Sequence, residues 1–219
     1  MRIEKYVHSC LMLSDGGQRL LFDPGKFSFV DGRVDPAQLS GADHILFTHG
    51  HPDHVDLKAL NSIVGERDIP MFGTKNVVAK LREAGLNAKV FESGKRELGP
   101  FAVEALKVRH EPILADEIPE IAAFVVNDRF LNPGDSFDKA LHRLAGIEIL
   151  ALPVMAPFLT EIAVYKFAKT MRSRHIIPVH DGYARDYFLS QRYDTYAPYL
   201  EEAGMILHRI ETPGDGVDL

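Results

Sequence analysis

The stretch THGHPDH, residues 48–54, places three histidines and one aspartate within seven residues. These side chains are His49, His51, Asp53 and His54, and they come directly after the apolar run HILF. A surface loop has no structural need for imidazole and carboxylate groups at this density. Both groups are usual protein ligands of divalent metals such as zinc. The stretch therefore predicts a metal site.

The flanking sequence places this stretch on a loop between a strand and a helix. HILFT is an apolar run typical of a buried strand, and VDLKALNSIVGERD has apolar residues at helical spacing. In extended backbone, His49 and His51 project to the same side and can reach one ion. Asp53 and His54 follow where the chain turns into the helix and can face a second ion. A simple polar loop in which Asp53 caps the helix is the alternative, but the spacing favours metal ligands.

Three further ligand-type residues stand at the ends of apolar runs. His110 ends FAVEALKVRH, Asp135 lies in NPGDS after the strand-like FLN, and His180 ends HIIPVH. Each taken alone could be a surface histidine, a turn residue or a satisfied buried histidine. Together, in this order after the cluster, they favour one common site built from loops at strand ends.

The order of expected elements indicates the architecture. Strands alternate with helices up to residue 92, three strand-like runs follow without a helix between residues 101 and 136, and strands alternate with helices again. The first 13 residues read as one strand, and Gly16-Gly17 as a hairpin turn. Two similar halves packed sheet to sheet, with helices outside, would bury this many apolar strands.

The full pattern, H-x-H-x-D-H followed by a single His, Asp and His, resembles the metallo-β-lactamase superfamily of metal-dependent hydrolases. VHSCLML and LLFDPG resemble its opening strands, NPGDS its G-D segment and IIPVHDGY its closing segment. Through the pair His8-Ser9 and the segment from LALPVM to IIPVH, the chain resembles most the small single-domain branch of metal-dependent hydrolases that is ascorbate-6-phosphate lactonase-like. That branch opens with Gly-His-Ser, where Val7 stands here, and the context RHEPI around His110 also departs from it.

The resemblance implies an α/β (α+β) fold, a four-layer αββα sandwich of two mixed sheets flanked by helices, with residues 1–219 as one domain. It implies seven ligands to two divalent ions: His49, His51 and His110 for one, Asp53, His54 and His180 for the other, and Asp135 bridging them. Asp53 and Asp135 are the expected catalytic carboxylates. Zinc suits the histidine-rich ligand set, and manganese, iron or nickel can occupy the same geometry.

The implied activity is hydrolysis of a small ester, lactone or phosphorylated metabolite by a metal-bridging hydroxide, since two cations lower the pKa of the water between them. Two alternatives stay open: a phosphodiesterase or nuclease of the same fold, and a metal-binding module without turnover. A redox enzyme is disfavoured, because diiron oxidoreductases of this fold typically have glutamate at the position of His51.

Three more residues are candidates for the surroundings of the metals. Asp23 in LLFDPG could orient a ligand histidine or form a turn before Pro24-Gly25. His8 could line the pocket or simply end a strand. Asp181, beside His180, could move protons or cap the next segment.

Composition limits the remaining possibilities. The chain has 219 residues, 46% hydrophobic and 26% charged, as in ordinary soluble proteins. A formal net charge of -6 argues against nucleic-acid binding. The single cysteine, Cys10, excludes an intramolecular disulfide and a cysteine-rich zinc module. We see no signal peptide or membrane-spanning run. We therefore expect a cytoplasmic protein that acts on a small molecule; a homo-oligomer stays open.

Overall fold

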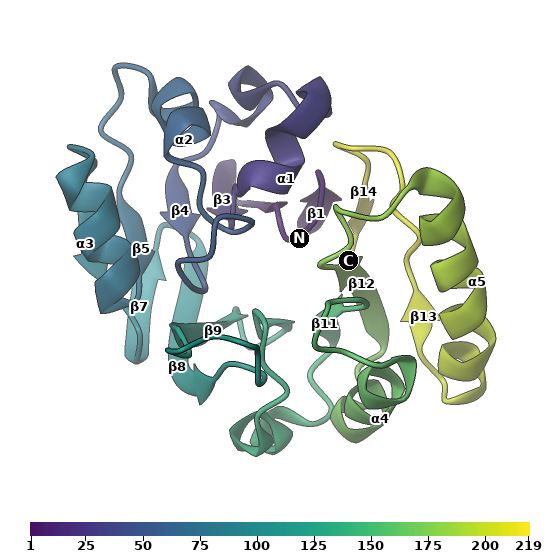
Figure 1. Ribbon diagram of the computed structural model, residues 1–219. Coiled ribbons are helices and arrows are strands. Elements are labelled where there is room, and N and C mark those ends of the chain that lie inside the picture. Colours follow the sequence, from purple (N-terminus) through teal and green to yellow (C-terminus); the bar gives the residue numbers. More distant parts are fainter.

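The computed structural model describes residues 1–219 and contains two mixed sheets of seven strands each (Figure 1). The first sheet has the spatial order β14 (Gly216–Asp218), β1 (Arg2–Lys5), β2 (Leu11–Asp15), β3 (Gln18–Phe22), β4 (His44–Leu46), β5 (Met71–Gly73) and β6 (Ala88–Val90). The second has the order β13 (Ile206–Leu207), β12 (His175–Val179), β11 (Ile149–Pro153), β10 (Phe130–Asn132), β9 (Glu120–Val126), β8 (Phe101–Arg109) and β7 (Gly94–Leu98).

Each sheet is antiparallel on one side and parallel on the other. In the first sheet the pairs from β14 to β3 are antiparallel and those from β3 to β6 are parallel. In the second sheet the pairs from β7 to β10 are antiparallel and those from β10 to β13 are parallel. The last strand, β14, returns to pair with β1, which brings the two chain ends together (Figure 1).

Helices cover the outer faces of both sheets (Figure 1). On the side of the first sheet lie α1 (Lys26–Phe29), α2 (Leu57–Val64) and α3 (Lys75–Glu83), with the short 3-10 helices η1 (Val30–Gly32) and η2 (Pro36–Leu39). On the side of the second lie α4 (Glu161–Met171) and α5 (Asp186–Glu202), with η3 (Lys139–Leu144). None of these helices combines the length and the apolar character that crossing a membrane requires.

Three apolar clusters mark the three interfaces between the four layers. Along β3, Leu20 and Phe22 belong to the cluster between the sheets, whereas Leu21 belongs to the cluster under α2 and α3. This alternation follows from the two-residue period of a strand. The third cluster joins the second sheet to α4 and α5, with Phe167 and Tyr193 among its members. The predicted four-layer αββα sandwich is therefore confirmed.

Some predicted boundaries are wrong. The expected single strand over the first 13 residues is two strands, β1 and β2, separated by a tight turn. Tyr6 N–H donates to the Cys10 carbonyl (2.9 Å) and Cys10 N–H to the Val7 carbonyl (3.1 Å), with His8 at a φ of 65°. The run YDTYAPYLEEAG predicts a helix from Tyr193, but α5 begins earlier, at Asp186. The edge strand β7 was not expected, because its exposed residues GKRE lack an apolar pattern.

Candidate metal centre

The seven predicted metal ligands lie together, each in a loop after a strand. Two groups of metal-ligand atoms form, and within each group the atoms lie within 4.8 Å of one another. One group contains His49, His51, His110 and Asp135, and the other contains His8, Asp53, His54 and His180. The structure thus brings together residues from both halves of the sandwich, and it adds His8 to the second group.

The loop that carries the histidine cluster is held close to the segment after β3. Lys26 N–H donates to the Pro52 carbonyl at 2.8 Å. A Cβ added at Gly25 would lie 1.8 Å from the Asp53 carbonyl oxygen, so only glycine fits there. The LLFDPG segment therefore positions the backbone of Asp53 in addition to supplying Asp23.

Three of the histidines use Nδ1–H to donate a hydrogen bond to an oxygen, so the neutral form of each ring has its lone pair on Nε2. The acceptors are Asp23 Oδ2 for His54 (3.0 Å), the Glu111 carbonyl for His110 (2.6 Å) and the Met155 carbonyl for His180 (2.8 Å). Metal-bound histidines typically have such a partner on the other ring nitrogen. The three Nε2 atoms are therefore prepared to bind a cation.

Asp23 and Thr48 together fix the ring of His49. Asp23 accepts from the backbone N–H of Thr48 and from its hydroxyl, each at 2.8 Å. Because the hydroxyl proton goes to Asp23, the Thr48 oxygen accepts from His49 Nδ1 (3.1 Å). His49 Nε2 then carries a lone pair and lies 3.0 Å from Nδ1 of His51. A cation held by both nitrogens would account for this close approach.

Three buried polar atoms at the centre have no hydrogen-bond partner: Nε2 of His54, Nε2 of His110 and Oδ1 of Asp135. Leaving a buried polar group unpaired costs about 1–3 kcal/mol each. Asp135 Oδ1 lies 3.4 Å from His54 Nε2, and Asp135 Oδ2 lies 3.4 Å from His110 Nε2. These atoms face one another across a common space, and divalent cations fit this donor set.

Asp135 lies between the two groups of ligands. Its Oδ2 is 3.1 Å from His180 Nε2 and 3.6 Å from His49 Nε2, and the residue is 2% exposed. Burial opposes ionisation of Asp135, but the imidazoles of His180 and His54 hold its pKa well below the usual value. Burial alone would lower the pKa of His54, yet Asp135 and Asp23 raise it well above normal. Protons and divalent cations therefore compete for the same atoms.

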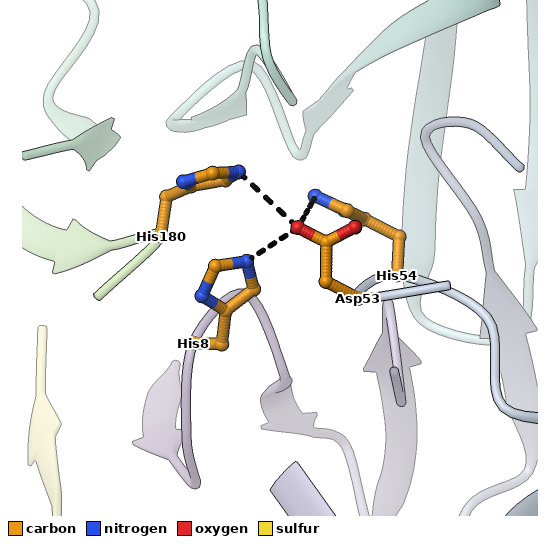
Figure 2. A group of neighbouring side chains, drawn as sticks. All are labelled: His8, Asp53, His54 and His180. Atoms are coloured by element: carbon orange, nitrogen blue, oxygen red, sulfur yellow. Dashed lines mark hydrogen bonds and ion pairs between the residues drawn. The ribbon is translucent and has the colours of Figure 1, made fainter. Parts of the chain in front are cut away.

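The three residues predicted around the metals lie in different surroundings. Asp23 is fully buried and accepts hydrogen bonds from His54 and Thr48, and it also stands in the tight turn before Gly25, whose N–H donates to the Asp23 carbonyl at 2.8 Å. His8 lies beside Asp53, with 3.0 Å between His8 Nε2 and Asp53 Oδ2 (Figure 2). Burial lowers the pKa of His8 to about 4. The Asp181 carboxylate contacts Lys5 and Tyr193 instead.

Asp181 belongs to a buried ion pair behind the site. It contacts Lys5 Nζ and accepts a hydrogen bond from the Tyr193 hydroxyl, and all three residues are at most 3% exposed. Burial and the Asp181 carboxylate raise the pKa of Tyr193. This contact ties β1 and α5 to the residue after His180, which is a structural role.

Several residues that hold the candidate ligands in place through hydrogen bonds were not predicted from the sequence. Thr48 lies at the start of the stretch THGHPDH, and its hydroxyl could have indicated a hydrogen bond to a neighbouring histidine. Glu111 explains the unusual RHEPI context: its N–H donates to the Asp135 carbonyl, and its carboxylate accepts from Phe137 N–H, both at 2.9 Å. The Met155 carbonyl gave no sequence signal, because any residue supplies one.

A family model described as the beta-lactamase superfamily domain matches residues 2–180. The chain therefore belongs to the metallo-β-lactamase superfamily, as its motifs predicted. Protein Rv0786c of Mycobacterium tuberculosis is 28% identical over 191 residues, covering 83% of this chain and 84% of the relative. A UPF0173 metal-dependent hydrolase of Natranaerobius thermophilus is 28% identical over 196 residues, covering 82% and 83%. The solved structure of Igni18, a metallo hydrolase from Ignicoccus hospitalis, has a TM-score of 0.71 at 17% identity, covering 99% and 97%.

Proposed function

We propose that this protein is a hydrolase that depends on two bound divalent metal ions and acts on a small ester, lactone or phosphorylated metabolite. The observation that carries the proposal is the convergence of buried, unpaired ligand atoms from His54, His110 and Asp135. The names of relatives such as the UPF0173 metal-dependent hydrolase support the same class of reaction. Zinc is the ion that the histidine-rich set suits best.

The proposed ligand assignment follows the two groups of atoms, except that His8 is left out and Asp135 is shared. His49, His51 and His110 would hold one ion, Asp53, His54 and His180 the other, and Asp135 would contact both. Bound divalent ions lower the pKa of water and polarise a substrate oxygen. The chain itself fixes the imidazole tautomers, keeps Asp135 ionised through its histidine neighbours, and excludes water behind the ligands by burial.

The site is open on one side. Of the seven proposed ligands, only His51 and Asp53 are partly exposed, and the Asp53 side chain is 19% accessible. A substrate therefore reaches the site over these two residues. No serine or cysteine nucleophile is needed, and Cys10 is fully buried.

A groove of about 660 Å³ borders the site, and most of its lining residues are hydrophobic. Tyr183 and Met155 line it, and the Tyr183 hydroxyl and the Met155 carbonyl contact Nδ1 of His180 at 3.2 and 2.8 Å. Arg192 in the groove is paired with Glu161, which offsets its charge. The apolar residues suit an ester or lactone with an apolar portion, whereas Arg185, in the same lining and outside any ion pair, suits a phosphorylated metabolite.

The experiment that tests the proposal begins with protein purified without added metal. Elemental analysis should find about two divalent ions per chain. Chelator-treated protein, reloaded with Zn²⁺, Mn²⁺, Fe²⁺ or Ni²⁺, is then assayed against p-nitrophenyl esters, lactones, thioesters and p-nitrophenyl phosphodiesters. We expect metal-dependent hydrolysis of an ester or lactone. Protein that binds no divalent ion, or whose hydrolysis survives complete metal removal, would overturn the proposal.

The phosphodiester arm of this assay tests the alternative function. The net charge of -6 supports a small-molecule substrate over a nucleic acid, because a phosphate-binding surface requires clustered cations. Cleavage of RNA or DNA, with binding that weakens steeply as salt rises, would favour the nuclease instead.

A further inference from the structure

His8 stands among the candidate metal ligands, although no ligand role was predicted for it. Figure 2 shows its ring beside those of His54 and His180, all three facing Oδ2 of Asp53. Distance alone allows His8 to be a fourth ligand of this group. The hydrogen bond at Nδ1 of His8 shows whether its Nε2 can bind a metal or instead donates a proton.

The backbone of Gly182 fixes the tautomer of His8. The N–H of Gly182 points at Nδ1 of His8, with 3.0 Å between the two nitrogens. A backbone N–H can only donate, so Nδ1 must offer its lone pair. The ring proton of the neutral imidazole then sits on Nε2, and it points at Asp53 Oδ2 at 3.0 Å. A protonated Nε2 has no lone pair for a metal.

We propose that His8 is a positioning residue: its Nε2–H holds the carboxylate of Asp53 in place for the metal, and His8 itself is not a ligand. This inference rests on the proposed function. Asp53 has the most accessible side chain of its group, at 19%. Its Oδ2 is also the oxygen nearest the other histidines, 3.6 Å from His180 Nε2 and 3.9 Å from His54 Nε2. The hydrogen bond from His8 therefore limits the motion of the Asp53 carboxylate, which is less buried than the other side chains of the group.

The turn between β1 and β2 is built to hold this ring. His8 is fully buried at a φ of 65°, and its carbonyl accepts from His180 N–H at 3.2 Å. Ser28 donates to the preceding carbonyl of Val7 at 2.9 Å, and the Phe27 ring packs edge-on against the imidazole. These contacts hold both His8 and the ligand His180 on one rigid unit, so the donor cannot easily turn away.

Two substitutions of His8 test separately the acceptor at Nδ1 and the donor at Nε2. His8→Asn keeps an acceptor near the Nδ1 position for Gly182, tolerates the positive φ, and has no donor that reaches Asp53. His8→Gln places an amide N–H near the Nε2 position and can restore that donor. His142→Asn, an exposed histidine in η3, is the matched control. Circular dichroism checks that each variant is folded.

Zn²⁺ affinity is measured on metal-free protein by competition with a chromophoric chelator. In His8→Asn we expect one of two Zn²⁺ ions to bind about 10- to 100-fold more weakly, the scale known for partners of metal ligands. His8→Gln should recover most of that loss, and His142→Asn should match the wild type. Nitrogen-15 histidine spectra should show the Nε2–H tautomer of His8 both without metal and with Zn²⁺ bound.

The outcomes are distinguishable. Loss of the His8 Nε2 proton on Zn²⁺ binding, with equal weakening in both His8 variants, would make His8 a ligand and overturn the inference. Wild-type affinity in His8→Asn would overturn it as well. Wild-type protein that binds no Zn²⁺ would refute the proposed function, and the positioning role with it, whatever the tautomer of the free protein.

Discussion

Replacing Asp23 with asparagine should weaken both metal positions without altering the shape of the site. The carboxylate is fully buried and accepts three hydrogen bonds, two from Thr48 and one from His54. Asparagine has nearly the same volume and tolerates the φ of 44° at this position. Its oxygen can still accept from the Thr48 N–H, but its amide nitrogen now faces the Thr48 hydroxyl and His54 Nδ1 as a donor.

The consequence is a change of tautomer. An amide that donates to His54 Nδ1 moves the imidazole proton to Nε2, the atom proposed to bind metal. The Thr48 hydroxyl, now an acceptor from the amide, can turn its own proton toward His49 Nδ1 and shift that ring in the same direction. In the metal-binding tautomer the Nδ1–H of His54 would face the amide N–H of the variant, so the variant lacks the hydrogen bond to a charged group that the wild type has. Such a bond contributes about 1.5–3 kcal/mol. The Zn²⁺ affinity should therefore fall about 10- to 100-fold.

The assay is a Zn²⁺ titration of metal-free wild type, Asp23→Asn and the control Asp35→Asn. Asp35 caps η2 on the surface through Ala37 N–H at 2.9 Å, and asparagine caps helices equally well. We expect wild-type affinity in the control and weaker binding in Asp23→Asn, with unchanged circular dichroism in both. Two Zn²⁺ ions bound by Asp23→Asn with wild-type affinity would show that the tautomer reasoning is wrong.

Three further predictions concern single residues. Asp135→Asn should reduce the bound metal below the wild-type value and slow hydrolysis about a hundredfold, as elemental analysis and rate measurements will check; full metal content with full activity would contradict its bridging role. Cys10 is fully buried, and burial raises the pKa of its thiol, so a thiol reagent should label it only in denaturant; rapid labelling of native protein would be the opposite result. Lys5→Met leaves the buried Asp181 carboxylate without its cation, and urea unfolding should show a loss of about 3–5 kcal/mol. A change below about 1 kcal/mol would mean that Tyr193 alone suffices for Asp181.

The clustering of the seven candidate ligands could be predicted from sequence because its signals are local and chemical. Residues 49–54 combine ligand-type side chains at a spacing that few structural roles require. His110 and His180 each end an apolar strand-like run, and in the structure they follow β8 and β12. The sheet core was predictable for a similar reason, since continuous apolar runs indicate buried strands.

The supporting contacts could not be predicted, because they depend on backbone groups brought together from distant parts of the chain. Met155 acts on His180 through its carbonyl, and Gly182 acts on His8 through its N–H. The role of Met155 requires no particular side chain, whereas position 182 requires glycine, because a Cβ there would lie 2.7 Å from the Cβ of His8. The turn that aims His8 into the site could not be predicted either. Its residues Tyr6, Val7 and Cys10 are all buried and apolar, a pattern that a continuous strand would also show.

Backbone strain gives an indication of the site that does not depend on family resemblance. Seven residues other than glycine have a positive φ, and three of them are His8, Asp23 and His180. This conformation costs a residue with a side chain about 1–2 kcal/mol, and it persists only where surrounding contacts impose it. Here those contacts link residues of the site to one another. His180 N–H donates to the His8 carbonyl, and the Asp23 carboxylate accepts hydrogen bonds from Thr48 and His54. Of the other four, Asn127 and Asp128 form the turn between β9 and β10, Asp31 lies within η1, and Arg172 ends α4. Strain that gathers around one group of buried imidazoles and carboxylates indicates that their orientation, and not only their presence, is what the fold maintains.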